Sequence, residues 1–127
     1  MRDHPHMDQL MPDLTIDPVL SPGERLELHR RRLGVTQQQY AGLVGVTVHR
    51  VRLWERDLRR VDQPNMADLE LEPHEWCWLR RRRAGWTLEA LSARLGLAVS
   101  WLHRAERGEL GADRIGALVD FWRREES

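Results

Sequence analysis

The feature that most constrains this chain is an internal repeat. The segment LHRRRLGVTQQQYAGLVG begins at Leu28, and the similar segment LRRRRAGWTLEALSARLG begins at Leu79. The offset of 51 residues holds without a gap over 34 aligned positions, of which eleven are identical in the two copies. A repeat at a constant offset predicts one supersecondary unit built twice. The 127 residues allow one domain or two very small ones, and the repeat favours two.

Start and stop signals predict three short helices in each copy. In the first copy, Ser21 and Glu24 form a capping box, and Thr36 and Thr47 can cap the next two helices. Gly34 and Gly45 are placed to end the first two helices in the left-handed conformation. The predicted helices cover residues 22–33, 36–44 and 47–56 in the first copy and residues 73–85, 87–96 and 98–108 in the second.

The segments outside the repeat carry their own patterns. Three prolines interrupt residues 1–20, so we expect a loosely ordered arm there. The run QPNMADLELE favours a short helix starting near Pro64. The run ADRIGALVDFWRREE, residues 112–126, places apolar residues on one stripe and predicts an amphipathic helix; the stripe is formed by Ile115, Leu118, Val119 and Trp122.

No strand pattern is found in the sequence. We therefore predict an all-α chain of about eight helices. The expected organisation is an arm over residues 1–20, one domain over residues 21–71 and a second domain over residues 72–127.

The net charge is zero, but the charges are not evenly spread. Residues 23–62 carry +4 and residues 76–127 carry +3, whereas residues 1–22 carry −3 and residues 63–75 carry −4. Local charge matters more than total charge for attraction of a polyanion. The two repeated segments can therefore still bind nucleic acid.

Several classes of function find no signal. Cys77 is the single cysteine, so no intrachain disulfide is expected, and the six histidines lack metal-ligand spacing. His74 and Cys77 lie on one helical side, but two ligands are too few for a metal site. The acidic residues are dispersed and no glycine-rich phosphate loop is present, so we expect neither an enzyme nor a cofactor. No run approaches about 18 apolar residues and no signal peptide is evident, so we expect a soluble, cytoplasmic protein without a membrane partner.

Both copies resemble the Cro/CI-type (XRE-like) helix-turn-helix family. The first copy matches over the run Arg30, Gly34, Thr36, Gln37, Tyr40, Ala41, Gly45, Val46, Thr47, Val51, Trp54, Glu55 and Arg56. The second copy matches over the run Arg81, Gly85, Thr87, Leu91, Ser92, Gly96, Leu97, Leu102, Glu106, Arg107 and Gly108. The resemblance implies two tandem lambda-repressor-like helix-turn-helix units of about four helices each.

The resemblance also implies a structural role for two ion pairs. In this family the first-helix arginine pairs with a glutamate at the end of the third helix. The corresponding pairs are Arg30 with Glu55 and Arg81 with Glu106. Each pair is expected to hold a third helix against a first helix.

The family's third helix enters the major groove of double-stranded DNA, and its N-terminal residues read base edges. The resemblance assigns DNA contacts in the first copy to Gln37, Thr47, Val48, His49, Arg50, Arg52 and Arg56. Arginine can bind guanine bidentately, and Val48 could meet a thymine methyl group. The candidate DNA contacts of the second copy are Ser100, His103, Arg104 and Arg107.

The second copy departs from the first at these reading positions. Ala98 replaces the cap Thr47, and Trp101 replaces Arg50. A bulky indole suits a packed contact better than base reading. The second copy could therefore bind DNA or a protein, with Trp101 and Trp122 as candidates for a protein interface. In addition, Trp76 and Trp78 cannot face the same way on one helix, so at least one of them is expected to be exposed or at an interface.

Two hypotheses follow from the sequence. The first is a sequence-specific DNA-binding transcriptional regulator, a repressor of bacterial or phage origin, associated with the nucleoid. The second is a protein-interaction adaptor or antitoxin-like module, in which the tryptophan-rich copy binds a protein partner or forms a homodimer.

Overall fold

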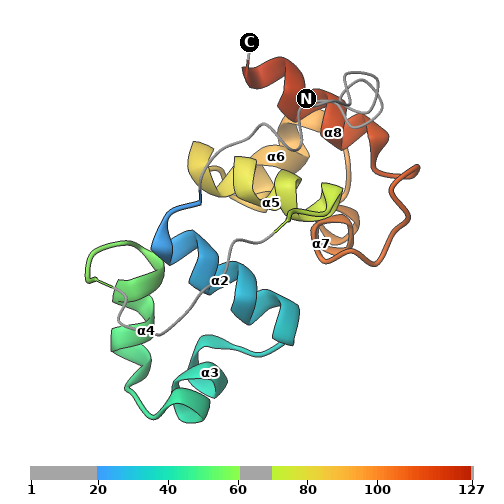
Figure 1. The fold of residues 1–127 in the computed structure, drawn as a ribbon. Coiled ribbons are helices and arrows are strands. Elements are labelled where there is room, and N and C mark those ends of the chain that lie inside the picture. Colours follow the sequence, from blue (N-terminus) through green and yellow to red (C-terminus); the bar gives the residue numbers. More distant parts are fainter. Residues whose placement is uncertain (1–19, 61–69, 127) are drawn as a thin grey trace, which may run out of the picture. The chain divides into compact units, whose positions relative to one another are not determined.

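The computed structural model describes residues 20–60 and 70–126, and these residues form seven helices and no strand (Figure 1). The predicted all-α class is confirmed for this part of the chain. The described residues fall into two compact units: residues 20–60 with Glu70 form the first unit, and residues 71–126 form the second unit. None of the described helices is long and apolar enough to cross a membrane.

Two expectations concern residues that are not described. The predicted helix near Pro64 falls mostly on residues 61–69, and nearly all of the predicted arm falls on residues 1–19, so both lie outside the described residues. The last residue of the expected arm, Leu20, is described and is buried.

The first unit contains three helices: α2 (Pro22–Leu33), α3 (Gln37–Val44) and α4 (Val48–Glu55). Ser21, Thr36 and Thr47 cap them, each accepting a hydrogen bond from the backbone N–H three residues further on. These bonds satisfy donors that have no partner inside the helix. Gly34 and Gly45 end α2 and α3 in the left-handed region, with φ of 72° and 77°. All five signals were predicted from the sequence.

The second unit repeats this arrangement and adds a helix. Its elements are α5 (Pro73–Ala84), α6 (Leu88–Leu95), α7 (Val99–Glu106) and α8 (Gly116–Glu126). The first three begin and end 51 residues after α2, α3 and α4. At the N-terminus of α7, Ala98 provides no side-chain cap, as its replacement of Thr47 predicted. The sequence repeat is therefore also a structural repeat, helix for helix.

The last helix starts later than its sequence pattern predicted. The backbone N–H of Arg114 donates to the Gly111 carbonyl, and the N–H of Ile115 donates to the Ala112 carbonyl. These bonds span three residues, as in turns, rather than the four of an α-helix. Residues 112–115 therefore form turns, and α8 begins at Gly116. The predicted apolar stripe is buried throughout, from Ile115 to Trp122.

Each unit has its own hydrophobic core. The first core is made of Leu26, Tyr40, Ala41, Val51 and Trp54, with four valines packed around it (Val35, Val44, Val46 and Val48). The second core is larger because α8 contributes to it. It is made of Trp76, Cys77, Leu91, Leu102, Ala105, Leu110, Ile115, Leu118, Val119, Phe121 and Trp122.

Aromatic side chains join α8 to the rest of the second unit. The ring of Trp86 lies 5.9 Å from that of Phe121 and 5.8 Å from that of Trp122, measured between centroids. Trp76 and Trp78 are both buried, at 0% and 3% exposure, so the alternative that one of them is exposed was wrong, and the alternative that one lies at an interface stays a prediction. The helix that carries them, α5, contacts both α7 and α8, so more than one of its faces is covered.

A polar contact ties the two ends of the first unit together. One carboxylate oxygen of Asp57 accepts from the backbone N–H of Gly23 at 2.8 Å, and the other accepts from the Ser21 hydroxyl at 2.7 Å. Gly23 has no space for a side chain, since a Cβ there would lie 2.5 Å from the Trp54 carbonyl oxygen. The start of α2 can lie this close to the end of α4 only with glycine at position 23.

In the second unit, the small and the large residue of the contact between the first and third helices are exchanged. The positions equivalent to Gly23 and Asp57 are His74 and Gly108. Gly108 has a φ of 77°, and a Cβ there would lie 2.8 Å from Nε2 of His74. The large residue has therefore moved from the end of the third helix to the start of the first.

Candidate nucleic-acid interface

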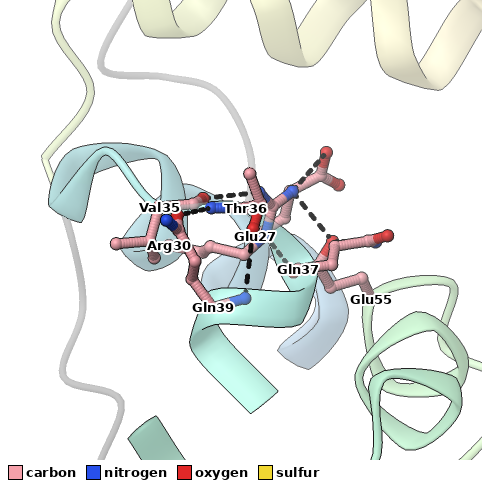
Figure 2. Close-up of polar contacts among 7 residues, drawn as sticks. All are labelled: Glu27, Arg30, Val35, Thr36, Gln37, Gln39 and Glu55. Carbon is pink, nitrogen blue, oxygen red and sulfur yellow. Dashed lines mark hydrogen bonds and ion pairs between the residues drawn. The ribbon is translucent and has the colours of Figure 1, made fainter. Parts of the chain in front are cut away.

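A buried ion pair fixes α4 against α2 in the first unit (Figure 2). Nε of Arg30 donates to Glu55 at 2.6 Å, and Nη2 donates to the other carboxylate oxygen at 3.2 Å. Nη1 of the same guanidinium donates to the carbonyl of Val35 at 3.0 Å. The Glu55 side chain is only 3% exposed. The arrangement matches the pairing that the family resemblance implied.

Gln37 is part of the same network. Its side-chain nitrogen donates to Glu55 at 2.9 Å. Because a carboxylate can only accept hydrogen bonds, the amide nitrogen must be the atom that faces Glu55. Gln37 was predicted as a DNA contact. In the structure its side chain already forms a hydrogen bond within the protein, to Glu55. One amide N–H and the amide oxygen remain for another partner.

The second unit contains the equivalent pair without this addition. Nε and Nη2 of Arg81 both donate to Glu106 at 2.7 Å, and Nη1 donates to the Trp86 carbonyl at 2.9 Å. The position of Gln37 is taken by Leu88, which packs against the second core. The arginine–glutamate pair is therefore common to both units. Among the described residues, the additional hydrogen bond from the side chain at the position of Gln37 is found in the first unit.

The outer side of α4 is basic. His49, Arg52 and Arg56 are exposed, and Arg50 is half-buried. Within the described residues, no carboxylate forms an ion pair with any of these four side chains. Two guanidinium groups and an imidazole on a helix of eight residues, with a third guanidinium on the C-cap residue Arg56, form a surface suited to an anionic partner.

Two other predicted contacts on this helix serve the fold. Val48 is half-buried and packs against the first core, so part of its side chain is already in contact with the protein. Its contact with a thymine methyl group stays a prediction. The hydroxyl of Thr47 is exposed, but it accepts the Arg50 backbone N–H at 3.2 Å as the helix cap.

The corresponding surface of the second unit is less basic. Arg104 and Arg107 both lie near Glu109, with Nε–carboxylate distances of 3.5 Å and 3.3 Å. All three side chains are well exposed, so these pairs are weak and could open for a stronger partner. They nevertheless offset the positive charge of α7. The sequence signal that could have shown this is Glu109 itself, because the equivalent residue in the first unit is Leu58.

The two predicted protein contacts of the second unit differ in burial, and for the half-buried Trp101 a protein contact stays a prediction. Trp101 is half-buried and packs against the core cluster, while Ser100 beside it is exposed. Trp122 is 3% exposed and lies in contact with Phe121, with ring centroids 4.9 Å apart. Trp122 is thus used to close its own unit and is not presented to a partner. The apolar stripe of the last helix predicted this burial, and the aromatic cluster around Trp86 is what the stripe packs against.

The pair His74 and Cys77 does not extend to a metal site in the described residues, which contain no group of three or more potential ligands. The His74 ring is packed against Gly108. Cys77 is fully buried, and burial, followed by the charge of Glu106, raises the pKa of its thiol far above the ordinary value. A buried neutral thiol of this kind is inert.

Comparisons with known proteins add no relative. No protein-family model matches the chain, and neither the curated proteins nor the solved structures contain a significant match. The functional argument therefore depends on the geometry of the two units.

Proposed function

We propose that this protein is a sequence-specific double-stranded DNA-binding regulator of transcription, acting as a repressor, built from two tandem Cro/CI-type helix-turn-helix units. The observation that carries the proposal is the contrast between α4 and α7. On α4 and its C-cap, the side chains of His49, Arg50, Arg52 and Arg56 have no described carboxylate partner. On α7 and its C-cap, Arg104 and Arg107 both pair with Glu109. The first unit is therefore the principal DNA-binding unit.

In the proposed complex, α4 lies in the major groove. Arg50 and Arg52 are candidates for bidentate contacts to guanine, and His49 can donate to a base edge or a phosphate. Arg56, at the end of the helix, is placed for phosphate contact, which adds affinity without sequence preference. The buried pair of Arg30 and Glu55 sets the orientation in which α4 meets the groove.

The amide oxygen and the second N–H of Gln37 also support the first unit as the principal DNA-binding unit. Its amide nitrogen is anchored to Glu55, so its oxygen and second N–H keep a fixed direction at the start of α3. A side chain that is already ordered loses less conformational entropy when it binds. The second unit, with Leu88 at this position, would contribute a weaker contact through Ser100, Arg104 and Arg107.

The experiment is a mobility-shift titration at low salt with DNA from upstream of the protein's own gene. Three proteins are compared: the wild type, the variant Arg50→Ala/Arg52→Ala, and the matched variant Arg104→Ala/Arg107→Ala of the second unit. Loss of one base contact costs about 1–3 kcal/mol, so the first variant should bind at least about tenfold more weakly. The second variant should lose less.

Salt and sequence competition complete the test. Affinity should fall steeply with salt, because each neutralised phosphate releases counterions. Unlabelled random DNA should compete less well against the wild type than against the Arg50→Ala/Arg52→Ala variant. Absence of binding at low salt would sink the proposal, and equal losses in both variants would remove the assignment to the first unit.

A further inference from the structure

The turn that follows the third helix has the same backbone in both units. Asp57 in the first unit and Gly108 in the second unit are left-handed, with φ of 57° and 77°. The next residue in each unit, Leu58 or Glu109, donates its backbone N–H to the carbonyl five residues earlier, at 2.9 Å and 3.1 Å respectively. This bond closes both helices in the same way. The side chains of Leu58 and Glu109 therefore leave the backbone at equivalent places, beside the end of the helix that is proposed to contact DNA.

The side chains at these two places differ in charge. The carboxylate of Glu109 divides its oxygens between two guanidinium groups: Oε1 lies 3.5 Å from Nε of Arg104, and Oε2 lies 3.3 Å from Nε of Arg107. In the first unit the residue is Leu58, which is 64% exposed and brings no charge. Arg56 stands at the position of Arg107. Among the described residues, the arginine common to both units thus has a carboxylate partner in the second unit alone.

The side of α7 that carries these arginines is the side that contacts DNA in the proposed function. Ser100, Arg104 and Arg107 are exposed and follow one another at spacings of four and three residues, so they share one side of the helix. Arginine contacts to phosphate add affinity without reading sequence. A carboxylate that already binds two guanidinium groups competes with phosphate for them, and its own negative charge repels the DNA backbone. Glu109 therefore lowers the affinity of this surface for any duplex.

We propose that Glu109 makes the second unit the weaker DNA contact, because its carboxylate holds Arg104 and Arg107 as an internal competitor of DNA phosphate. This role rests on the proposed function and deepens it, since it identifies the side chain that distinguishes the two units. A duplex of any sequence can meet either unit, and a weaker second unit leaves more of the binding to α4, which is proposed to read base edges. Glu109 thereby restrains binding to DNA of unrelated sequence.

The test uses the full chain and a duplex of random sequence, with binding measured by fluorescence anisotropy over a range of salt concentrations. The parent protein is Arg50→Ala/Arg52→Ala, in which a change in the second unit is not hidden by the first. Glu109→Gln is added to this parent, and it removes the charge while keeping the size of the side chain. The matched control is Asp120→Asn, which raises the net charge by the same amount at an exposed position on α8.

Glu109→Gln should strengthen binding to the random duplex about 2- to 30-fold, as release of two exposed ion pairs implies. The slope of log affinity against log salt concentration should steepen by about one for each phosphate newly contacted. Asp120→Asn should change the affinity much less. Further addition of Arg104→Ala/Arg107→Ala should abolish the gain from Glu109→Gln, because Glu109 acts through these two arginines.

The outcomes separate this role of Glu109 from the proposed function. No gain from Glu109→Gln, an equal gain from Asp120→Asn, or a gain that persists without the two arginines would overturn the role and leave the proposed function intact. The wild type is titrated alongside the variants. If it binds no duplex at low salt, the proposed function fails and the role of Glu109 fails with it.

Discussion

Removal of Glu55 tests how strongly the buried ion pair supports the first unit. The variant Glu55→Leu removes the carboxylate that binds Arg30 at 2.6 Å and leaves this guanidinium, whose side chain is only 14% exposed, with the more distant carboxylate of Glu27 at 3.9 Å. It also leaves the side-chain nitrogen of Gln37 without its acceptor. Arginine cannot lose its proton to relieve this. Breaking a buried pair by removal of one partner costs about 3–5 kcal/mol.

That cost is large for so small a unit. At about 0.05–0.15 kcal/mol per residue, a unit of this size has a free energy of unfolding of about 3–8 kcal/mol. We therefore expect Glu55→Leu to unfold much of the first unit. The variant Arg30→Met/Glu55→Leu removes both charges. It leaves neutral groups, such as the Val35 carbonyl and the Gln37 amide, without the partners that they now have, at about 1–3 kcal/mol for each group that stays buried. The double variant should thus be more stable than Glu55→Leu alone.

The sequence provides a separate reporter for each unit. Tyr40 is the single tyrosine and lies in the first core, and Phe121 is the single phenylalanine and lies in the second. Fluorinated tyrosine and phenylalanine would each give one ¹⁹F resonance, whose urea dependence yields the free energy of unfolding of its own unit. Glu55→Leu should shift the Tyr40 transition, and Glu106→Leu should shift the Phe121 transition. A loss below about 1 kcal/mol in Glu55→Leu, or a double variant as unstable as the sum of the single variants, would refute the reasoning.

Three further predictions concern caps, steric fit and ionisation. Of the two equivalent helices α4 and α7, only α4 has a side-chain cap. In urea titrations Ala98→Thr should therefore stabilise the second unit by about 1 kcal/mol, and Thr47→Ala should destabilise the first unit by a similar amount. No change in either free energy of unfolding would mean that these caps do not contribute to stability. Gly108→Ala should lower the thermal midpoint, because it forces alanine to a φ of 77° and sets a Cβ against His74; an unchanged midpoint would contradict this. Cys77 should react with a thiol reagent only on unfolding, and fast labelling of the folded protein at pH 8 would disprove its burial. Because burial raises the pKa of this thiol in the folded state, the free energy of unfolding of the second unit should be independent of this group below pH 9.0, the ordinary thiol pKa, and should fall as the pH rises above it.

The features that the sequence predicted best are local. Caps such as Ser21 and Thr36, and left-handed glycines such as Gly34, depend on residues within one turn of each other. Short-range chemistry of this kind can be read without knowledge of the tertiary fold. The 51-residue offset then carried the same assignments from the first copy to the second.

The features that were missed depend on neighbours distant in sequence. Val48 packs against a core to which other helices contribute, and Trp122, which the sequence placed both on a buried stripe and at a candidate protein contact, meets the ring of Trp86. The screening of α7 by Glu109 and the bond from Gln37 to Glu55 likewise join separate elements. Position in a motif predicted where these side chains start, but not which of several possible partners they meet.

The exchange of the small and large residues between the pairs Gly23–Asp57 and His74–Gly108 has a consequence for the evolution of the two units. A hybrid unit would arise if the start of one copy were joined to the end of the other at the same aligned position. One such hybrid would combine Gly23 with Gly108 and leave the Gly23 N–H without the carboxylate that now accepts from it. The reciprocal hybrid would combine His74 with Asp57 and put an imidazole where that carboxylate lies. We expect both hybrids to fold less well, so the junction would protect the two halves from being made alike and allow their surfaces to evolve separately.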